Sequence, residues 1–402
     1  MECVRTVSYG KARFSLPIVP ICVLMFHCVY GGKPGKAESP VGIWVEGQSM
    51  GDCAVRDLGT PALLLDLEAM EQNLDRMSCF YTKSEINLRP HFKNHRVLAL
   101  ASLQMKAGAI GITCARLTQA EVLVNFGIDN ILVANEIVDT PLIKAFAELS
   151  HHAPVIVAVD NAMVVDEMAW WSRKEQVELN IVTDVDVRLG RCGVKPGEAV
   201  LSLSKRALEK GLRLRGLMGY EGHVQSRLGT EKDQVVRTAL QSLVNCRKEL
   251  ESSGIAVEIV SCGGTSDYEI AGRFPGVTEN QAGSYLLMDT WFKPDAPDFN
   301  LSLSVLVTVI SKTPGERIIV NAGRKAISGE LGLPSIKGIP GLRVRAMHAE
   351  HTLIELEDPS VPVEVGDKIE IWVHYHDGTI NLHDRMYGIR NNKVEEIFAI
   401  ED

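Results

Sequence analysis

The sequence predicts an α/β protein, a (β/α)8 barrel followed by a smaller C-terminal β domain, and three observations support this prediction. From Thr60 to about residue 260, short apolar runs alternate with amphipathic stretches. The apolar runs are continuous, which is typical of strands buried on both faces of a parallel sheet. After Asn300 the helical stretches stop and only strand-like runs follow. We therefore assign residues 58–300 to the barrel and residues 301–402 to the β domain.

The barrel elements follow one another in a regular order. The predicted strands cover residues 62–65, 87–92, 109–114, 130–133, 155–159, 179–183, 214–218 and 256–260. Helical patterns follow the first seven of them, at residues 68–77, 97–106, 118–126, 141–149, 162–174, 197–210 and 231–251. An open doubly wound sheet is the alternative. It is less favoured because the first strand continues into Asp66-Leu67-Glu68, where such a sheet would carry a glycine-rich dinucleotide loop.

The C-terminal region reads as strands separated by turns. Turn dipeptides stand at Pro314-Gly315 and Pro340-Gly341. The predicted strands are residues 301–310, 317–320, 343–347, 352–356, 368–373 and 393–398.

The first fifty residues differ from the rest. Arg5, Lys11 and Arg13 precede an apolar run at 16–26 that is too short to span a bilayer. This pattern fits either a secretory signal that ends near residue 37 or a start codon placed upstream of Met50. We favour the upstream start and treat residues 1–50 as an extension outside the fold. The expected location is then cytoplasmic, with export as the alternative if residues 1–37 are a signal.

Composition limits the classes of partner. The net charge is −9, and no basic stripe with interleaved aromatic residues is present, which argues against nucleic acid as a partner. No segment predicts a membrane partner. The nine cysteines include no C-x-x-C pair, so zinc-knuckle and thioredoxin-like sites are not indicated. These features favour an enzyme that acts on a small molecule.

The segment R-P-H-F-K-N-H at residues 89–95 ends the second strand run and contains a candidate nucleophile, Lys93. In a barrel the C-terminal ends of the strands face the active site. A lysine in such a mouth is desolvated and close to other cations, which favours the neutral amine that forms a Schiff base. From composition alone, a surface lysine at the end of a strand is the more common case.

Two further strand ends carry groups suited to a cofactor ring. Arg191 lies in the loop after the sixth strand, and its planar fork can hold a phenolate or carboxylate oxygen. Tyr220 and His223 end the seventh strand, where a tyrosine can stack on a ring and a histidine can exchange protons near neutrality. A loop ion pair and a structural histidine are the alternatives.

Two small-residue loops suit an anion. Gly263, Gly264 and Thr265 follow the eighth strand, and Gly283, Ser284 and Tyr285 follow soon after. Glycines let backbone N–H groups approach an anion closely, and barrel phosphate sites commonly form from the last two strand loops. Either loop alone is more often a simple turn.

The β segment gathers potential metal ligands at Glu350-His351 and at residues 374–377, His-Tyr-His-Asp. On a strand, residues two apart share a face, so Tyr375 would lie beside Asp377 and His374 beside His376. A polar strand edge is the alternative.

Taken together, these segments resemble the D-threonine aldolase and eukaryotic-type D-serine dehydratase family, pyridoxal-phosphate (PLP) enzymes of fold type III whose barrel is related to that of alanine racemase. The R-P-H-x-K-x-H segment is the strongest match. The other matching segments follow in family order, at Thr60-Pro61-Ala62, Glu121, Arg191-Cys192-Gly193, Tyr220-Glu221-Gly222-His223, Gly263-Gly264-Thr265, residues 281–285 with Met288-Asp289, and Gly323-Arg324-Lys325-Ala326.

The resemblance implies specific roles. Lys93 would carry PLP as a Schiff base, and Arg191, Tyr220 and His223 would surround its ring. The phosphate would lie near Gly263, Gly264, Thr265, Gly283, Ser284 and Tyr285. The family also has a metal motif, H-x-D or H-x-C. Here Asp377 matches its second ligand, but Tyr375 stands where a histidine is expected, so His376 is the candidate partner for a divalent Mn or Zn ion.

Three functions remain open from the sequence. The first is a PLP-dependent lyase of D-β-hydroxy amino acids, most simply a D-threonine-type aldolase, with D-serine or D-3-hydroxyaspartate dehydration as the alternative reaction. The second is an amino-acid racemase, which needs a second base that the sequence does not identify. The third is a non-catalytic PLP carrier, which would not require the β domain. By analogy with such barrels we expect a homodimer.

Overall fold

A computed structural model describes residues 53–224 and 229–401 of the chain. The predicted N-terminal extension, residues 1–50, lies outside the described residues. The chain divides into Met1–Pro40 and Val41–Asp402, and every described residue belongs to the second unit. None of the described helices has the length and apolar content needed to cross a membrane.

The barrel is built from eight parallel strands in the spatial order β2-β9-β8-β7-β6-β5-β4-β3. Its two edge strands meet through a bridge between His91 and Thr113 and through the backbone bond from Ile110 N to Leu88 O, 2.9 Å, so the sheet closes. The strands are β2 (Asn87–Leu88), β3 (Ile112–Cys114), β4 (Ile131–Glu136), β5 (Val155–Val159), β6 (Asn180–Asp184), β7 (Arg213–Met218), β8 (Ile259–Cys262) and β9 (Glu279–Asn280).

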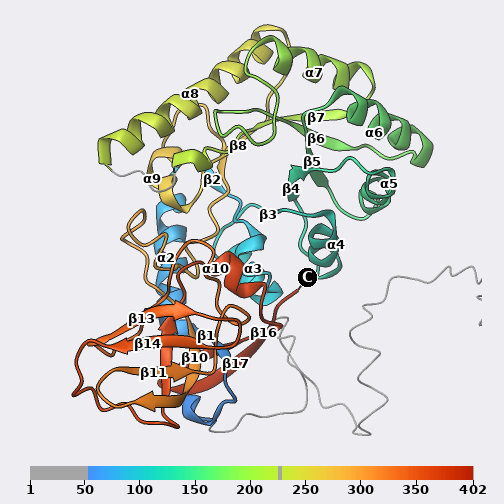
Figure 1. Ribbon diagram of the computed structural model, residues 1–402. Helices are drawn as coiled ribbons and strands as arrows, with labels where there is room; N and C mark the ends of the chain where they lie inside the picture. Colours follow the sequence, from blue (N-terminus) through green and yellow to red (C-terminus); the bar gives the residue numbers. More distant parts are fainter. Residues whose placement is uncertain (1–52, 225–228, 402) are drawn as a thin grey trace, which may run out of the picture. The chain divides into compact units, whose positions relative to one another are not determined.

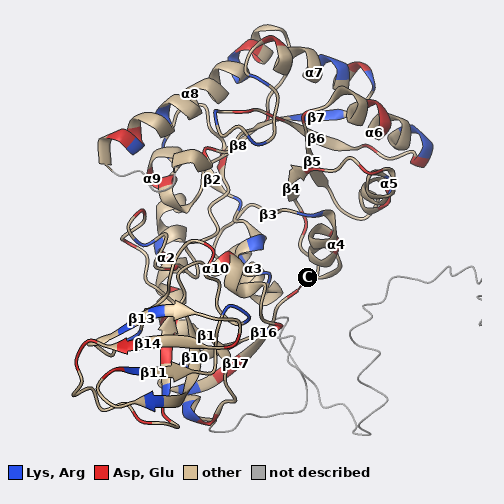
Figure 2. Ribbon diagram, viewed as in Figure 1, with Lys and Arg blue, Asp and Glu red and all other residues tan. Residues whose placement is uncertain are grey.

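Helices cover the outside of this sheet (Figure 1). Every residue of β5 is buried, because a parallel strand packs on the barrel interior with one face and on helices with the other. Figure 2 shows both signs of charge interspersed on the outward helices α6 to α8. The helices are α2 (Leu67–Thr82), α3 (Leu98–Lys106), α4 (Leu117–Asn125), α5 (Thr140–Leu149), α6 (Ala162–Glu175), α7 (Glu198–Glu209), α8 (Gly229–Ser252) and the short α9 (Tyr268–Ala271).

The β domain contains one strand from the start of the chain. β1 (Ala62–Asp66) pairs antiparallel with β10 and parallel with β16, and in Figure 1 it lies among the C-terminal strands. The other strands are β10 (Leu303–Thr313), β11 (Arg317–Val320), β12 (Ser335–Ile336), β13 (Leu342–Met347), β14 (Thr352–Leu356), β15 (Lys368–Trp372), β16 (Arg385–Arg390) and β17 (Lys393–Ala399), with the short helix α10 (His376–Ile380) between β15 and β16.

The predicted fold class is confirmed, with one correction to which strands form the barrel. The run at 62–65 was expected to be the first barrel strand, but it belongs to the β domain, and β9 is the eighth barrel strand instead. An apolar run shows that a strand is buried and does not show which sheet buries it. As a result, the two glycine loops follow the seventh and eighth strands of the barrel, where phosphate sites commonly form.

A buried ion pair joins β2 and β9, the first and last barrel strands in the sequence. Arg89, just after β2, donates from Nε and Nη2 to the two carboxylate oxygens of Glu279 in β9, at 2.8 and 2.9 Å. Both side chains are almost fully buried, 2% and 3% exposed. Arg89 Nη1 also donates to Asn130 O, and Gly111 leaves the space for this guanidinium because a Cβ there would collide with it. This geometry is bidentate and buried, and bidentate pairing is the strong form of the interaction.

We expect Arg89→Met to destabilise the protein by about 3–5 kcal/mol, because it leaves the Glu279 carboxylate buried without a partner. The double variant Arg89→Met/Glu279→Leu should recover most of that loss, and urea or thermal unfolding would measure both. The control is Arg343→Met, which breaks a surface pair with Glu355 and should cost less than about 1 kcal/mol. Equal losses for the two single variants would contradict this account.

Candidate functional site

Lys93 lies in a one-turn 3-10 helix, η2 (Phe92–Asn94), directly after β2. The turn is anchored by Phe92, which is fully buried, and by the N–H of Lys93, which donates to His91 Nδ1 at 3.3 Å. Lys93 is half-buried, as expected for an amine in a barrel mouth. Burial first, and the charge of Lys93 next, hold the pKa of His91 well below its ordinary value. His91 is therefore a neutral imidazole beside the amine at neutral pH.

The two glycine loops form a cradle with no room for side chains. A Cβ on Gly283 would meet the backbone O of His91 at 2.7 Å and also collide with Asn94 Oδ1. Gly263 has φ +77° and lies against Asn280 and Ala271 in the same way. The loops are tied together because Tyr285 N donates to Thr265 Oγ1 at 2.9 Å.

A buried donor points into this cradle. Within residues 53–224 and 229–401, the Nδ2 of Asn280 is buried without a hydrogen-bond partner, and it lies against Gly263. A buried donor left unsatisfied is costly, and an anion or water between the loops would satisfy it. The Thr265 hydroxyl accepts from Tyr285 N, so its own hydrogen can be donated to the same anion. The cradle therefore fits a phosphate group.

Asn94 links the barrel mouth to the β domain. Its Nδ2 donates to Ser284 Oγ at 3.2 Å and to Asp377 Oδ1 at 2.7 Å, and it lies 3.1 Å from His376 Nε2. Burial would raise the pKa of Asp377, but the nearby His376, Lys93 and Asn94 hold it below its ordinary value. The sequence motif contained Asn94, yet its residue type alone did not indicate this linking role.

His376 and Asp377 lie together although they are adjacent in sequence. Residues 374–377 were expected on a strand, where neighbouring side chains face opposite sides. In the structure β15 ends at Trp372 and α10 begins at His376. In a helix, adjacent side chains diverge far less than on a strand, so His376 Nε2 and Asp377 Oδ1 lie 3.0 Å apart. The strand-face expectation is wrong for this pair.

Asp289 holds the other side of the His376 ring. Its Oδ2 accepts from His376 Nδ1 at 2.5 Å and from the backbone N–H of His376 at 2.9 Å. A carboxylate on Nδ1 orients an imidazole so that Nε2 points toward a metal ion. Nε2 here points to Asp377, so the two side chains provide one nitrogen and one oxygen donor that fit a divalent cation. Within the described part of the chain, no set of three or more His, Cys, Asp or Glu side chains could hold a metal, so water or substrate would complete the coordination.

His374 faces elsewhere. Its Nδ1 lies 2.6 Å from Thr290 Oγ1, and its ring packs edge-on against Trp291. His374 therefore serves as a packing residue. Tyr375 occupies the N-cap position of α10, without a hydrogen bond from its side chain.

The predicted ring residues lie at neighbouring strand ends. The guanidinium carbon of Arg191 lies 5.7 Å from the centre of the Tyr220 ring. Burial first, and a hydrogen bond with Glu136 next, raise the pKa of Asp184 to about 8, while Arg191 opposes the rise. Asp184 and Glu136 were not singled out from the sequence, because a carboxylate at the end of a strand has many structural uses.

His223 lies in the 3-10 helix η3 (Gly222–Val224), directly after Glu221. Glu221 and Asp267 are both buried below the first glycine loop and bond to its backbone. Asp267 lies in η4 (Thr265–Asp267), and no motif in the sequence pointed to it.

A relay of hydrogen bonds joins the lysine segment to the second glycine loop. His95 Nδ1 accepts from Val97 N at 3.0 Å, so its Nε2 donates to Gln104 Oε1 at 3.1 Å. Gln104 Nε2 donates to the Tyr285 hydroxyl at 3.0 Å. The predicted site residue Tyr285 is thus fully buried beneath the site, with its hydroxyl directed to Gln104.

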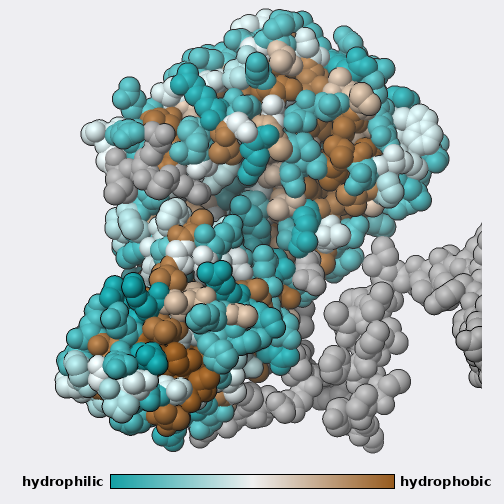
Figure 3. Space-filling model, viewed as in Figure 1, coloured by the Kyte–Doolittle hydropathy of each residue, from teal (hydrophilic) through white to brown (hydrophobic). Residues whose placement is uncertain are grey.

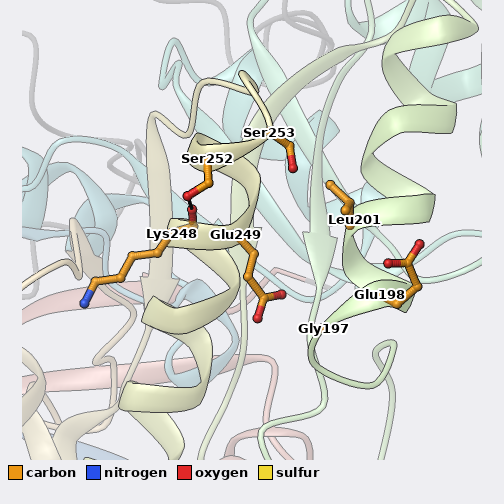
Figure 4. A pocket seen from close by; sticks show the side chains of 7 residues that line it. All are labelled: Gly197, Glu198, Leu201, Lys248, Glu249, Ser252 and Ser253. Carbon is orange, nitrogen blue, oxygen red and sulfur yellow. Dashed lines mark hydrogen bonds between the residues drawn. The ribbon is translucent and has the colours of Figure 1, made fainter.

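A surface pocket elsewhere is separate from this cluster. It has a volume of about 500 Å³ and lies between the start of α7 and the end of α8. In Figure 4 the Lys248 side chain points away from Leu201 and Glu198, and Ser252 Oγ donates to Lys248 O at 2.7 Å. The pocket therefore lacks converging groups suited to a cofactor. Figure 3 shows hydrophilic side chains mixed with smaller apolar areas over the face of the molecule that it draws.

The fold and this cluster define a barrel in which a half-buried lysine lies beside two glycine loops that fit an anion. Residues 65–290 match the alanine racemase N-terminal domain family, and residues 302–389 match the putative serine dehydratase domain family. The chain belongs to this family of barrel enzymes with a serine-dehydratase-type β domain.

Two curated relatives show how closely it resembles known members. It is 35% identical over 349 residues to a D-threonine aldolase of Arthrobacter sp., which covers 85% of this chain and 92% of that protein. It is 30% identical over 358 residues to a 3-hydroxy-D-aspartate aldolase of Paracoccus denitrificans (strain Pd 1222), covering 86% of this chain and 92% of the relative.

A solved structure agrees in fold. The D-threonine aldolase from Filomicrobium marinum superposes with a TM-score of 0.84 at 31% identity, covering 87% of this chain and 97% of that one. A second solved structure is the D-threo-3-hydroxyaspartate dehydratase of Delftia sp. HT23, in a cysteine-to-alanine variant described as metal-free. It superposes with a TM-score of 0.80 at 24% identity, covering 87% of this chain and 99% of that one. These relatives are aldolases and a dehydratase, and the chain is an enzyme of the same class, the lyases.

The relay predicts a pH dependence of stability. Burial lowers the pKa of His95 to about 4, against the opposing bonds from Gln104 and Val97. The folded protein therefore resists protonation of this ring more than the unfolded chain does, so the contribution of His95 is complete above about pH 6.5 and is lost as pH falls toward 4, by up to about 3 kcal/mol.

We expect His95→Gln to flatten this acid limb, measured as unfolding midpoints between pH 4.5 and 8. His351→Gln, at an exposed turn of the β domain, should keep the wild-type profile. A His95→Gln variant that loses stability between pH 6.5 and 4.5 as steeply as the wild type would refute the role of this ring.

Proposed function

We propose that the chain is a PLP-dependent lyase of D-β-hydroxy amino acids, most simply an aldolase that yields glycine and an aldehyde, with Lys93 as the amine that carries the cofactor. The observation behind this proposal is the convergence of the Lys93 turn, the two glycine loops and the His376–Asp377 pair. Asn94 bonds to Ser284 and Asp377, and Tyr285 N joins the second glycine loop to Thr265 of the first. The relatives named as aldolases support the aldolase reaction over the dehydratase reaction.

PLP would be held by groups already described. Thr265, Ser284 and Asn280 would hold its phosphate between the glycine loops, and Arg191 and Tyr220 would flank its ring. When bound, the cofactor supplies an electron sink for carbon–carbon bond cleavage. The residues of this chain orient the substrate and move its protons. The neutral imidazole of His91, next to Lys93, is suited to accept a proton.

A divalent ion, Mn²⁺ or Zn²⁺, would be bound by His376 Nε2 and Asp377, with Asp289 orienting the imidazole. A Lewis acid at this position would hold the β-oxygen of a substrate seated at Lys93. A dehydratase of the same fold has a form described as metal-free, which supports a metal in this group of enzymes. In this chain the candidate histidine, His376, stands one position later than the family motif places it, at the start of α10.

The alternative functions are less well supported. A PLP carrier has no need of the β domain, whereas here Asn94 binds directly to Asp377 of that domain. A racemase would act without the His376–Asp377 pair. Measuring glycine and aldehyde against the L-enantiomer after incubation with D-threonine, and then with D-3-hydroxyaspartate, separates cleavage from racemisation and selects the substrate.

We expect Lys93→Ala to remove the cofactor absorbance near ~420 nm and to lower D-threonine cleavage by several orders of magnitude, because no amine remains to bind the aldehyde. Lys83→Ala, on the surface just past α2, is the matched control and should keep both. A folded Lys93→Ala protein that retained the band would refute the assignment of Lys93.

We expect His376→Ala to weaken Mn²⁺ or Zn²⁺ binding about 100-fold or more, measured by titration calorimetry of the purified protein, because one of two protein donors is lost. His374→Ala is the matched control, since that ring contacts Thr290 and Trp291 instead of Asp377. Chelation should abolish activity, and added metal should restore it. If His374→Ala lost metal affinity and His376→Ala kept it, the assignment of the ligands would be wrong.

A further inference from the structure

Two buried carboxyl groups lie directly beneath the first glycine loop. Glu221 follows β7 and is fully buried, and its Oε2 accepts from Gly263 N at 3.2 Å. Asp267, in η4, is 4% exposed, and its Oδ1 accepts from Gly264 N at 2.8 Å. The two carboxyl groups lie close enough to affect each other's pKa, and within the described residues Glu221 Oε1 is buried without a hydrogen-bond partner. A proton shared between the two groups would satisfy this oxygen and remove their mutual repulsion.

The surroundings indicate which group holds the proton. Burial raises the pKa of Glu221 well above its ordinary value, and the charge of Asp267 adds to the rise. Burial also raises the pKa of Asp267, but Gly264 N–H, Glu221 and Lys232 oppose this. Lys232 is itself held by Asp295 at 3.2 Å. Glu221 is therefore the protonated partner and Asp267 the ionised one.

Other titratable groups also face the pair. They are Tyr220 next to Glu221 in the chain, Cys262 at the end of β8 and Tyr81 of α2, and burial raises the pKa of all three. These groups stay neutral near pH 7, so the charge in this pocket depends on Asp267, Lys232 and the shared proton.

The bonds to the pair fix how the loop is oriented. The N–H groups of Gly263 and Gly264 are directed down to the carboxyl groups, so they are not available to an anion in the cradle. The groups left to an anion are the Thr265 hydroxyl, which accepts from Tyr285 N, and Asn280 Nδ2, which lies against Gly263. A loop turned the other way would lose both buried carboxyl–amide bonds.

We propose that Glu221 and Asp267 are positioning residues that share one proton and hold the loop at residues 263–265 in the orientation that receives the cofactor phosphate. This inference rests on the proposed function, because the phosphate is that of PLP. Loss of the proton would leave two carboxylates in contact, and their repulsion would release the loop. The pKa of Glu221 would be higher with the loop held than with the loop released. The protonated group therefore stabilises the held loop at low pH, and this stabilisation is lost as the pH rises.

The test compares Glu221→Gln with Glu221→Leu in the full-length apoprotein. Glutamine keeps the shape and both bonds, since its amide donates to Asp267 and accepts from Gly263 N–H, but it has no proton to lose. Leucine removes both bonds. The matched control is Glu198→Gln, an exposed glutamate at the start of α7. Circular dichroism checks the fold, and affinities for PLP and for pyridoxal, which lacks the phosphate, are measured from pH 6 to 10.

We expect PLP affinity of the wild type and of Glu198→Gln to fall toward pH 10 more steeply than that of Glu221→Gln. Near pH 7, Glu221→Gln should bind PLP within about twofold of the wild type, while Glu221→Leu should bind it about tenfold or more weakly. Pyridoxal affinity should be similar in all four proteins.

Parallel pH profiles for wild type and Glu221→Gln would overturn the proposal, even if Glu221→Leu failed to fold. Equal losses of PLP and pyridoxal affinity in Glu221→Leu would also overturn it, because the pair would then act on the lysine or the ring. If the wild type binds PLP normally and both Glu221 variants behave like Glu198→Gln, this inference is wrong and the proposed function still stands. A wild type that bound no PLP would refute the proposed function together with this inference.

Discussion

The pairing of β2 with β9, the first and last barrel strands in the sequence, is the constraint on which the site depends. Arg89 and Glu279 face each other across this junction with both carboxylate oxygens engaged. Such a buried pair adds little net stability compared with an apolar core, since desolvation offsets most of the attraction. Its effect is on specificity: a shift of one strand by one residue would leave a buried charge unpaired. The ion pair therefore fixes the register, Asn87 opposite Glu279 and Leu88 opposite Asn280.

That register sets the geometry of the mouth. The Lys93 turn follows β2 and the second glycine loop follows β9, so a fixed register brings Asn94 to Ser284 and the carbonyl of His91 to Gly283. The relay from His95 through Gln104 to Tyr285 repeats the same connection one layer deeper. The barrel alone does not complete the site, because Asn94 also binds Asp377, and Asp289 holds the backbone of His376.

Sequence periodicity predicted most of the fold, because buried parallel strands and amphipathic helices leave strong local patterns. It assigned β1 to the wrong sheet, since an apolar run carries no information about its pairing partner. It missed β16, where Arg385 and Arg390 flank a short mixed run. Lys93 was singled out by its family-like motif and the glycine loops by their place at strand ends, and the structure brings these segments together. Glu279, Asp267 and the orienting role of Asp289 were not found, because each depends on a partner far away in the sequence.

Carboxyl groups surround the predicted cofactor position, and each group of them is neutralised in its own way. Asp289 and Asp377 enclose His376, so a cation is favoured between them, whether a proton on the ring or a metal ion at Nε2. Glu136 raises the pKa of Asp184 near Arg191, and Glu221 and Asp267 affect each other's pKa near Lys232. Without these compensating charges, the carboxylates would repel a phosphate and a substrate carboxylate through a poorly screened interior. In the proposed site, the protonation states of these pairs would therefore set the potential that an anionic ligand meets at Lys93, although none of them would need to touch the ligand.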